Sequence, residues 1–504
     1  MTAAIAGIAV LTMFIMTFIV YRAFGPRNET LLPSDQEKLT WTELVSGSLG
    51  TILAKTSIFA TLTSLATVYV FFIGNTRVFG FWILFAIVTL LVGAYVTVAL
   101  SRRIVSARPM AQTRPSRALI ADLVAGDDAD SVRTRALVNG LMVVYLLVIL
   151  LLEFSVFSHI TADLVGGTTG EWLGPAIFFF VLYLVSLFTL KYGMRGFVYA
   201  DLFQSPFLVL GSIIVLGGAF ALLYSNLSNA GPLQGFQLVG NELATPRVPI
   251  YTGLVFAASA LVLNSFLVCA TPAHWARMWI FGSKTVLNAQ VPATWITALV
   301  WLFLVIVGAT LSASFSIQEG AESFIAGERA VAWFLSELAD VNAILLFFFW
   351  LAAVAALFST ADTQLFCLVL SLKYSPSRRE LKSVQNVKLP ALWSILIAVT
   401  FTGLFTVLQD SNLLLDKIVF VTLPACLVIV PTLVGVAFGF KRLFLATLIS
   451  TIGYLAIGAV ALTSKEQDYA WTVVPPLFPL LVAATLFAQR RFGLTSDVVE
   501  ESSK

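Results

Sequence analysis

Charged side chains are scarce in this chain. Its 504 residues include 30 Lys and Arg and 27 Asp and Glu, so that only 11% are charged, whereas a soluble domain has about 25%. So few charges could not cover the surface of a folded body of this size in water. The composition therefore excludes a soluble enzyme, and a net charge of +3 is too small to predict a nucleic-acid partner.

Histidine and cysteine are rarer still, with two and three residues respectively. Cys269, Cys367 and Cys426 lie far apart in the sequence and show neither the spacing of a zinc site nor that of a disulfide framework. No nucleotide-binding loop and no activated nucleophile stands out. We therefore expect no transition-metal site, no cofactor and no catalytic residue.

Long apolar runs are what the chain has in abundance, with 59% hydrophobic residues and a mean hydropathy of +0.93. A stretch of about 18 apolar residues can cross the hydrocarbon core as a helix, and the alternating pattern of an outer-membrane β-strand is missing. The first stretch lacks a basic start and a cleavage site, so it predicts a retained helix. We expect an all-α polytopic membrane protein with thirteen spans, centred near residues 12, 60, 90, 148, 182, 210, 262, 300, 356, 399, 427, 452 and 480.

Basic residues predict the orientation of these spans. The loops after odd-numbered spans and the C-terminal segment hold 24 of the 30 Lys and Arg, and the loop 101–136 alone has seven arginines. Because cytoplasmic loops are rich in Lys and Arg, we expect the N-terminus outside and the C-terminus in the cytoplasm, in the plasma (cell inner) membrane. An amphipathic run in the outer segment 316–340 predicts either a helix that lies on the bundle or a lid over a vestibule.

Four segments with polar residues interrupt the apolar pattern. They read YGMRGFVYADLFQ (192–204), AALFSTADTQL (355–365), NSFLVCATPAHWARMWIFGS (264–283) and ATLTSLAT (60–67). Together these segments resemble the signature segments of the sodium/solute symporter family, which includes sodium-coupled proline, pantothenate and sugar transporters. The resemblance covers about residues 40–440.

The resemblance implies a LeuT-type fold, with two inverted repeats of five helices. We expect a first helix and cytoplasmic loop at 1–40, one repeat at 41–225, the second at 250–440, and two further spans with a cytoplasmic tail at 441–504. The first helix of each repeat should be discontinuous near the membrane midplane. Pro272 is a helix breaker at the right place for the second repeat, whereas the glycine-rich break usual in the first repeat is missing.

The resemblance also implies a site. The positions that match the family's sodium ligands supply hydroxyl or carbonyl oxygens, which suit a hard monovalent cation. Asn264 stands where sugar-transporting members bind substrate, but its amide could equally bond a neighbouring helix. Asp201 could act in gating or be a structural carboxylate at the membrane interface. The candidates are Ala60, Thr63, Ala356, Ser359 and Thr360 for sodium, Thr67, Asn264, Ser265 and Phe266 for the solute, and Lys55, Asp201, Arg277 and Asp362 for gating and coupling.

Three further residues are unusual within or near a membrane span. Lys55 could snorkel to the headgroups, pair with a carboxylate such as Asp201 or Asp362, or take the place of a bound cation. Glu153 could contact a substrate amine or merely a polar neighbour. We expect His274 to lie at the membrane interface, at the cytoplasmic end of its span.

The sequence therefore predicts a cation-coupled, sodium-driven secondary transporter that imports a small organic solute by alternating access. Its partners would be that solute, Na⁺ and the lipid bilayer. Hexoses are disfavoured, because Thr67 replaces an amide of the sugar carriers. Two alternatives remain, a sensor or regulatory subunit that acts with a partner chain, and a sodium-independent carrier in which Lys55 replaces the cation.

Overall fold

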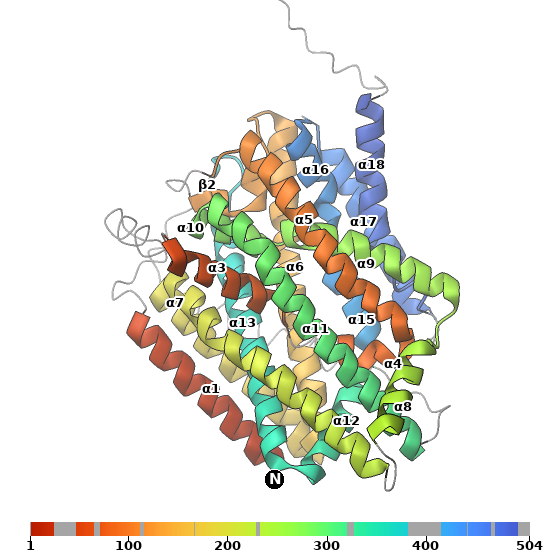
Figure 1. Cartoon of the computed structure of the whole chain (residues 1–504). Helices are drawn as coiled ribbons and strands as arrows, with labels where there is room; N and C mark the ends of the chain where they lie inside the picture. Colours follow the sequence, from red (N-terminus) through yellow and green to blue (C-terminus); the bar gives the residue numbers. More distant parts are fainter. Residues whose placement is uncertain are drawn as a thin grey trace, which may run out of the picture.

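The computed structural model of the chain is a helical bundle with one short antiparallel hairpin (Figure 1). It describes residues 2–24, 47–64, 71–110, 115–165, 167–227, 232–319, 327–381, 415–440, 442–464 and 469–491. The α-helices are α1 (Thr2–Phe24), α3 (Gly47–Thr61), α4 (Asn75–Phe79), α5 (Ile83–Ala107), α6 (Ala129–Val165), α7 (Gly167–Asn226), α8 (Pro232–Ala244), α9 (Ile250–Ala270), α10 (Pro272–Phe281), α11 (Ser283–Glu319), α12 (Gly327–Val341), α13 (Ala343–Lys373), α15 (Leu415–Thr422), α16 (Val430–Phe438), α17 (Phe444–Thr463) and α18 (Leu477–Arg491). The 3-10 helices are η2 (Gly80–Trp82), η3 (Pro115–Ala118), η4 (Ile120–Leu123) and η5 (Leu423–Ile429), and the strands are β1 (Tyr374–Ser375) and β2 (Glu380–Leu381).

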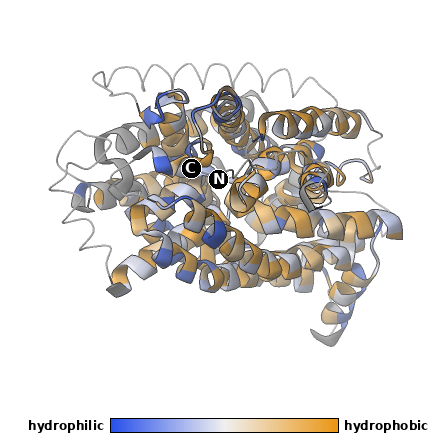
Figure 2. Ribbon diagram, turned by 90° about the horizontal axis from the view of Figure 1, so that it is seen from above, coloured by the Kyte–Doolittle hydropathy of each residue, from blue (hydrophilic) through white to orange (hydrophobic). Residues whose placement is uncertain are grey.

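The predicted all-α membrane protein is confirmed. Eight helices in the described parts are long and apolar enough to cross a membrane, and three shorter apolar helices lie at 4–19, 173–182 and 477–489. Seen from above, hydrophobic residues cover most of the helices (Figure 2). The number thirteen stays a prediction, since the span expected near residue 399 lies outside the described residues.

Helix α7 spans 60 residues and holds two of the predicted spans. Its residue contacts show that its two halves run in opposite directions, so the chain reverses between Phe178 and Asp201. The first half runs antiparallel to α6, the second half runs antiparallel to α13, and α6 and α13 are themselves antiparallel. The pairs that fix these directions are Gly174 with Ser158 and Phe178 with Phe154, Asp201 with Ser359 and Gly211 with Ala352, and Asn139 with Ser371 and Phe157 with Trp350.

Two spans are broken, as the resemblance implies. Helix α3 ends at Thr61, and the chain is again helical at Phe71, before α4. Helix α9 ends at Ala270, where Thr271 is extended (φ −91°, ψ 135°) and Pro272 opens α10. Proline favours an extended residue before it and has no N–H to lose at the start of a helix, so it ends α9 and begins α10. The Trp275 indole N–H donates to the Cys269 carbonyl across this break at 2.7 Å.

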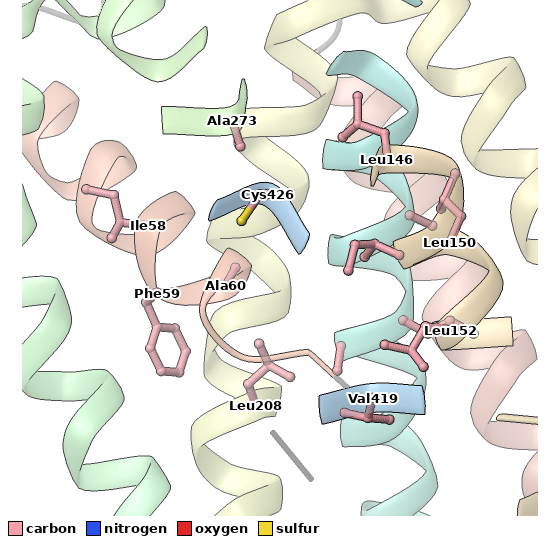
Figure 3. Close-up of a cluster of buried hydrophobic side chains, with 14 of the residues drawn as sticks. Ile58, Phe59, Ala60, Leu146, Leu150, Leu152, Leu208, Ala273, Val419 and Cys426 are labelled. Atoms are coloured by element: carbon pink, nitrogen blue, oxygen red, sulfur yellow. The ribbon is translucent and has the colours of Figure 1, made fainter. Parts of the chain in front are cut away.

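The helices form two packed groups. Helix α5 packs against α9 and α11, and α11 packs against α3, so these four elements make one group, which contains both breaks. Helices α6, α7 and α13 make the other group, with α1 against its outer side. Buried apolar side chains such as Ile58 of α3, Leu146 of α6, Leu208 of α7 and Cys426 of η5 join the two groups (Figure 3).

The amphipathic run predicted in segment 316–340 forms α12 in its second part. This helix packs on α6, α7 and α13 through a buried apolar face that includes Phe334 and Leu338. Its Trp333 meets Phe315 of α11 edge-on, with ring centroids 5.2 Å apart. Helix α12 therefore lies on the bundle and also reaches the group of helices that holds the breaks. Its role as a lid stays a prediction.

The end of the bundle opposite α12, which we call the basic end, is tied together around Asp122 of η4. This carboxylate is buried and lies 3.3 Å from the Arg117 Nε and 3.2 Å from the Arg379 Nε. The Tyr374 hydroxyl donates to the same carboxylate at 3.2 Å. Burial, followed by the charge of Asp122, raises the pKa of the Tyr374 phenol. The α5–α6 loop and the β1–β2 hairpin are thus held to each other on this side.

Gly93 of α5 offers a test of the packing between α5 and α9. A Cβ atom at this position would overlap the backbone carbonyl of Asn264 in α9, whereas one at Gly140 of α6 would meet nothing within 4 Å. We expect Gly93→Ala to destabilise the protein by about 1–3 kcal/mol, because neither backbone can yield. The matched control Gly140→Ala should be neutral or stabilising by up to about 1 kcal/mol.

Thermal unfolding of the two variants in detergent, followed by tryptophan fluorescence, measures this difference. Equal transition temperatures for the two variants would contradict the close α5–α9 crossing.

Candidate functional site

Asp201 is the centre of a buried polar cluster between the two groups of helices. Its side chain is 1% exposed. One carboxylate oxygen accepts a hydrogen bond from the Ser57 hydroxyl of α3 at 2.6 Å, and the other accepts one from the Ser359 hydroxyl of α13 at 2.8 Å. The carboxylate is thus enclosed by helices, and the two roles left open for it, gating or structure, both stay predictions.

Arg277 of α10 extends the cluster. Its Nε donates to the Ser57 hydroxyl at 2.8 Å, and one terminal nitrogen donates to the Thr61 hydroxyl. The Ser57 hydroxyl therefore bridges the two charged groups, because it accepts from the guanidinium and donates to Asp201. Ser57 and Thr61 lie one turn apart and so share a face of α3. Through these bonds the cluster joins α3, α7, α10 and α13, and it connects both broken spans.

Ser359 and Thr360 lie in the middle of α13, and both are buried. The Ser359 hydroxyl gives its hydrogen to Asp201, rather than to the carbonyl one turn earlier. The Thr360 hydroxyl is buried and has no hydrogen-bond partner among the described residues. Both oxygens therefore keep lone pairs that could accept a cation.

The predicted sodium ligands of α3 lie where this helix ends. Ala60 is fully buried in its last turn, and its carbonyl accepts the Thr63 N–H at 3.2 Å. The Thr63 hydroxyl donates to the Phe59 carbonyl at 3.0 Å and also keeps its lone pairs. Ala356, the remaining candidate, is buried one turn before Thr360 in α13. The structure shows the environment of these oxygens, and the ion remains a proposal.

A cavity of about 130 Å³ lies beside the polar cluster. Side chains from both breaks line it, including Leu62 and Ser64 after α3 and Thr271 before α10. Thr360 and Arg277 of the cluster also face it. Its other walls come from α5, α6, α9, α11, α15 and η5. A ligand in this cavity would touch both groups of helices and both breaks.

Asn264 lines the cavity, but its amide nitrogen is occupied. It donates to the Ala86 carbonyl and to the Thr89 hydroxyl of α5, both at 2.9 Å. The bond to a neighbouring helix is thus present, and only the side-chain oxygen is left for a solute. Ser265 and Phe266 do not line this cavity, whereas Leu267, the next residue, does. Thr67 lies outside the described residues.

Lys55 lies on the other side of α3 from the cluster. It lies two positions before Ser57, which is a rotation of about 200° around a helix. Its side chain is partly exposed, and no ion pair to Asp201 or Asp362 is present, so the predicted pairing is wrong for these partners. Asp362 is buried in α13, and Glu153 is buried in α6.

His274 is fully buried inside the protein, and its Nε2 lies 2.9 Å from the Ser101 hydroxyl of α5. Its position at the membrane interface stays a prediction. Sequence reasoning missed Ser57 and Thr61. Their spacing of four residues in an apolar helix was the available signal.

Comparisons with known proteins identify the fold. No protein-family profile and no curated protein sequence matches the chain. Among solved structures, a Na⁺-coupled sialic acid symporter in a substrate-bound, outward-open state matches with a TM-score of 0.63 and 13% identity, over 95% of this chain and 97% of that chain. MhsT in complex with L-phenylalanine matches with a TM-score of 0.52 and 15% identity, over 88% of this chain and 98% of that chain. The LeuT-type fold predicted from the polar segments is confirmed.

Asp201→Asn tests whether the cluster holds the helices together. An amide can accept from one of the two serine hydroxyls but presents its own N–H groups to the other, and the negative charge near Arg277 is lost. We expect a loss of about 3–5 kcal/mol, as for other broken buried charge networks, measured as a lowered thermal unfolding temperature in detergent.

Ser205→Ala is the matched control, because Ser205 lies one turn away and bonds only backbone carbonyls of Asp201 and Thr56. That change should lower stability by about 1 kcal/mol. If the two variants unfolded at the same temperature, Asp201 would not be the anchor of the cluster.

Proposed function

We propose that this chain is a sodium-coupled secondary transporter that imports a small organic solute. The observation that carries the proposal is the set of hydroxyl oxygens of Thr63, Ser359 and Thr360, which lie at the end of α3 and in the middle of α13. Two of these hydroxyls direct their hydrogens to other acceptors, and the third has no partner among the described residues. All three can therefore turn lone pairs toward a cation.

The carbonyl oxygens of Ala60 and Ala356 complete the proposed ligand set. Na⁺ is a hard cation, and neutral hydroxyl and carbonyl oxygens suit it. The break after α3 frees backbone groups from helical hydrogen bonding near the middle of the bundle, where transporters with broken helices bind their ions. A matching fold in a symporter that is Na⁺-coupled supports this assignment, as do the polar segments of the sequence.

Coupling would follow from where the ion binds. Helix α3 belongs to one group of helices and α13 to the other, so a cation between them favours the state in which the two groups are close at this point. The cavity touches the same two groups through Leu62, Thr271 and Thr360. Each ligand would thus raise the affinity for the other. Rocking of one group against the other would then expose the cavity to the two sides of the membrane in turn.

The double change Ser359→Ala with Thr360→Ala removes two of the five proposed ligands. We expect equilibrium binding of ²²Na⁺ to the purified protein to weaken at least tenfold, since each lost oxygen contributes about 1–3 kcal/mol. The unfolding temperature should fall as well, because Asp201 loses the hydrogen bond that the Ser359 hydroxyl donates to it. Thr297→Ala is the control, as this buried hydroxyl of α11 bonds its own helix at the Ala293 carbonyl. Unchanged ²²Na⁺ affinity in a folded double variant would contradict the sodium site.

Lys55 decides between this proposal and a carrier that needs no sodium. Because Lys55 faces away from Ser57 and the cluster, we expect Lys55→Met to leave ²²Na⁺ binding unchanged within twofold, like the charge-conserving Lys55→Arg. If the native protein did not bind ²²Na⁺ and Lys55→Met did, the ammonium group would be the substitute for the cation, and the proposal of sodium coupling would fail.

A further inference from the structure

The cavity has an apolar part and a polar end. Its apolar part is largely aromatic. Phe71 stacks on Phe256 with ring centroids 6.2 Å apart and tilts against Phe420 at 5.1 Å, and Phe72 packs on Trp301 at 4.7 Å. These five side chains come from the chain after the first break and from α9, α11 and α15. Such walls accept a flat or branched apolar group, and they give no hydrogen bond to a sugar.

The polar end carries a positive charge. Among the residues that the structure describes, Arg277 is the single charged side chain that lines the cavity. It is 3% exposed. Its nitrogens donate to the neutral hydroxyls of Ser57 and Thr61, and no carboxylate oxygen of the described residues lies within 4 Å of them. The guanidinium thus faces the cavity, and its charged neighbour Asp201 is reached only through the Ser57 hydroxyl.

The neighbouring groups favour an acceptor as the partner of Arg277. The Asn264 nitrogen is already engaged with α5, and the Thr61 and Thr271 hydroxyls donate to backbone carbonyls of their own helices. Gln364 and Ser64 also line the cavity, but they are neutral, so Arg277 is the charged donor that the cavity offers among the described residues. A planar guanidinium matches the two oxygens of a carboxylate, which it can bind through two parallel hydrogen bonds.

We propose that the solute is a compact organic carboxylate, with its carboxylate group against Arg277 and an aromatic or branched apolar body among the five aromatic side chains. The size of the cavity, about 130 Å³, is close to the roughly 150 Å³ of a cavity that takes one benzene ring. This inference rests on the proposed function and gives the coupling an electrostatic cause. A cation and an anionic solute bound together add no net charge to the buried site, whereas either one alone does.

A series of matched ligands tests the charge on the native protein. Phenylacetate, phenylacetamide and phenethylamine share one apolar body and differ in the polar group, and 4-methylpentanoate replaces the ring by a branched chain. Binding is measured by calorimetry on the purified protein in sodium sulfate and in potassium sulfate. We expect the two carboxylates to bind ten- to a hundredfold more tightly than the amide, on the order of a charged hydrogen bond, and the amine not to bind.

Substitutions then assign this preference to Arg277. In Arg277→Gln the preference for carboxylate over amide should disappear, and in Arg277→Lys part of it should remain, because the charge is kept without the planar fork. Arg103→Gln is the matched control. It removes one positive charge from the end of α5, where Arg103 stacks on Phe438 with its guanidinium carbon 4.2 Å from the ring centroid, and it should leave the preference unchanged.

Three results would overturn the inference. The first is equal or tighter binding of the amine or the amide by the native protein, which needs no variant to fold. The second is a carboxylate preference that survives in Arg277→Gln. The third concerns the thermal unfolding temperature of the protein. If sodium chloride raised it above the value in sodium sulfate and no carboxylate raised it further, Arg277 would hold an inorganic anion.

The sodium arm separates this inference from the proposed function. Suppose that the carboxylates bind more tightly than the amide to the same extent in potassium and in sodium, and that Arg277→Gln loses this preference. That result would support the anionic solute and contradict sodium coupling. Sodium-dependent binding of the amine alone would do the reverse.

Discussion

A carboxylate and a guanidinium buried among apolar helices need polar partners, and in this bundle two serine hydroxyls supply most of them. Ser57 lies between Asp201 and Arg277, and Ser359 bonds Asp201 from the other group of helices. Ionised groups inside a membrane protein are expensive unless such partners satisfy them. The cluster therefore ties α3, α7, α10 and α13 to one another at the centre of the bundle, beside the two breaks.

The breaks give the cluster its relevance for binding. An unbroken helix in a membrane offers only the second lone pair of its carbonyl oxygens, because each N–H and C=O is already paired within the helix. At Thr61 and at Thr271 the helical pairing stops, and the Leu62 carbonyl accepts instead from the Trp301 indole at 3.3 Å. Polar groups thus become available next to a cavity that both groups of helices line, which is the arrangement that alternating access requires.

Local chemistry made part of this architecture predictable from the sequence. The ring of Pro272 is enough to predict a break, and the length of an apolar stretch is enough to predict a span, so neither prediction needs the fold. The pairing of Ser57 with Asp201 could not be read, because 144 residues separate them and only the packing of α3 on α7 brings them together. The end of α3 at Thr61 lacks proline and the expected glycines, so it depends on its surroundings. The burial of His274 against Ser101 could not be read either, because it follows from the packing of distant parts of the chain.

The central claim is that sodium joins the end of α3 to the middle of α13. Amide hydrogen exchange, measured by mass spectrometry on the purified protein in sodium and in potassium at equal ionic strength, tests it without knowledge of the solute. Amides close to a bound ion lose the local openings that allow exchange. The account predicts slower exchange in sodium for Thr61–Ser64 and for Ala355–Leu365 together. Identical exchange in the two salts, or slowing in only one of the two segments, would contradict it.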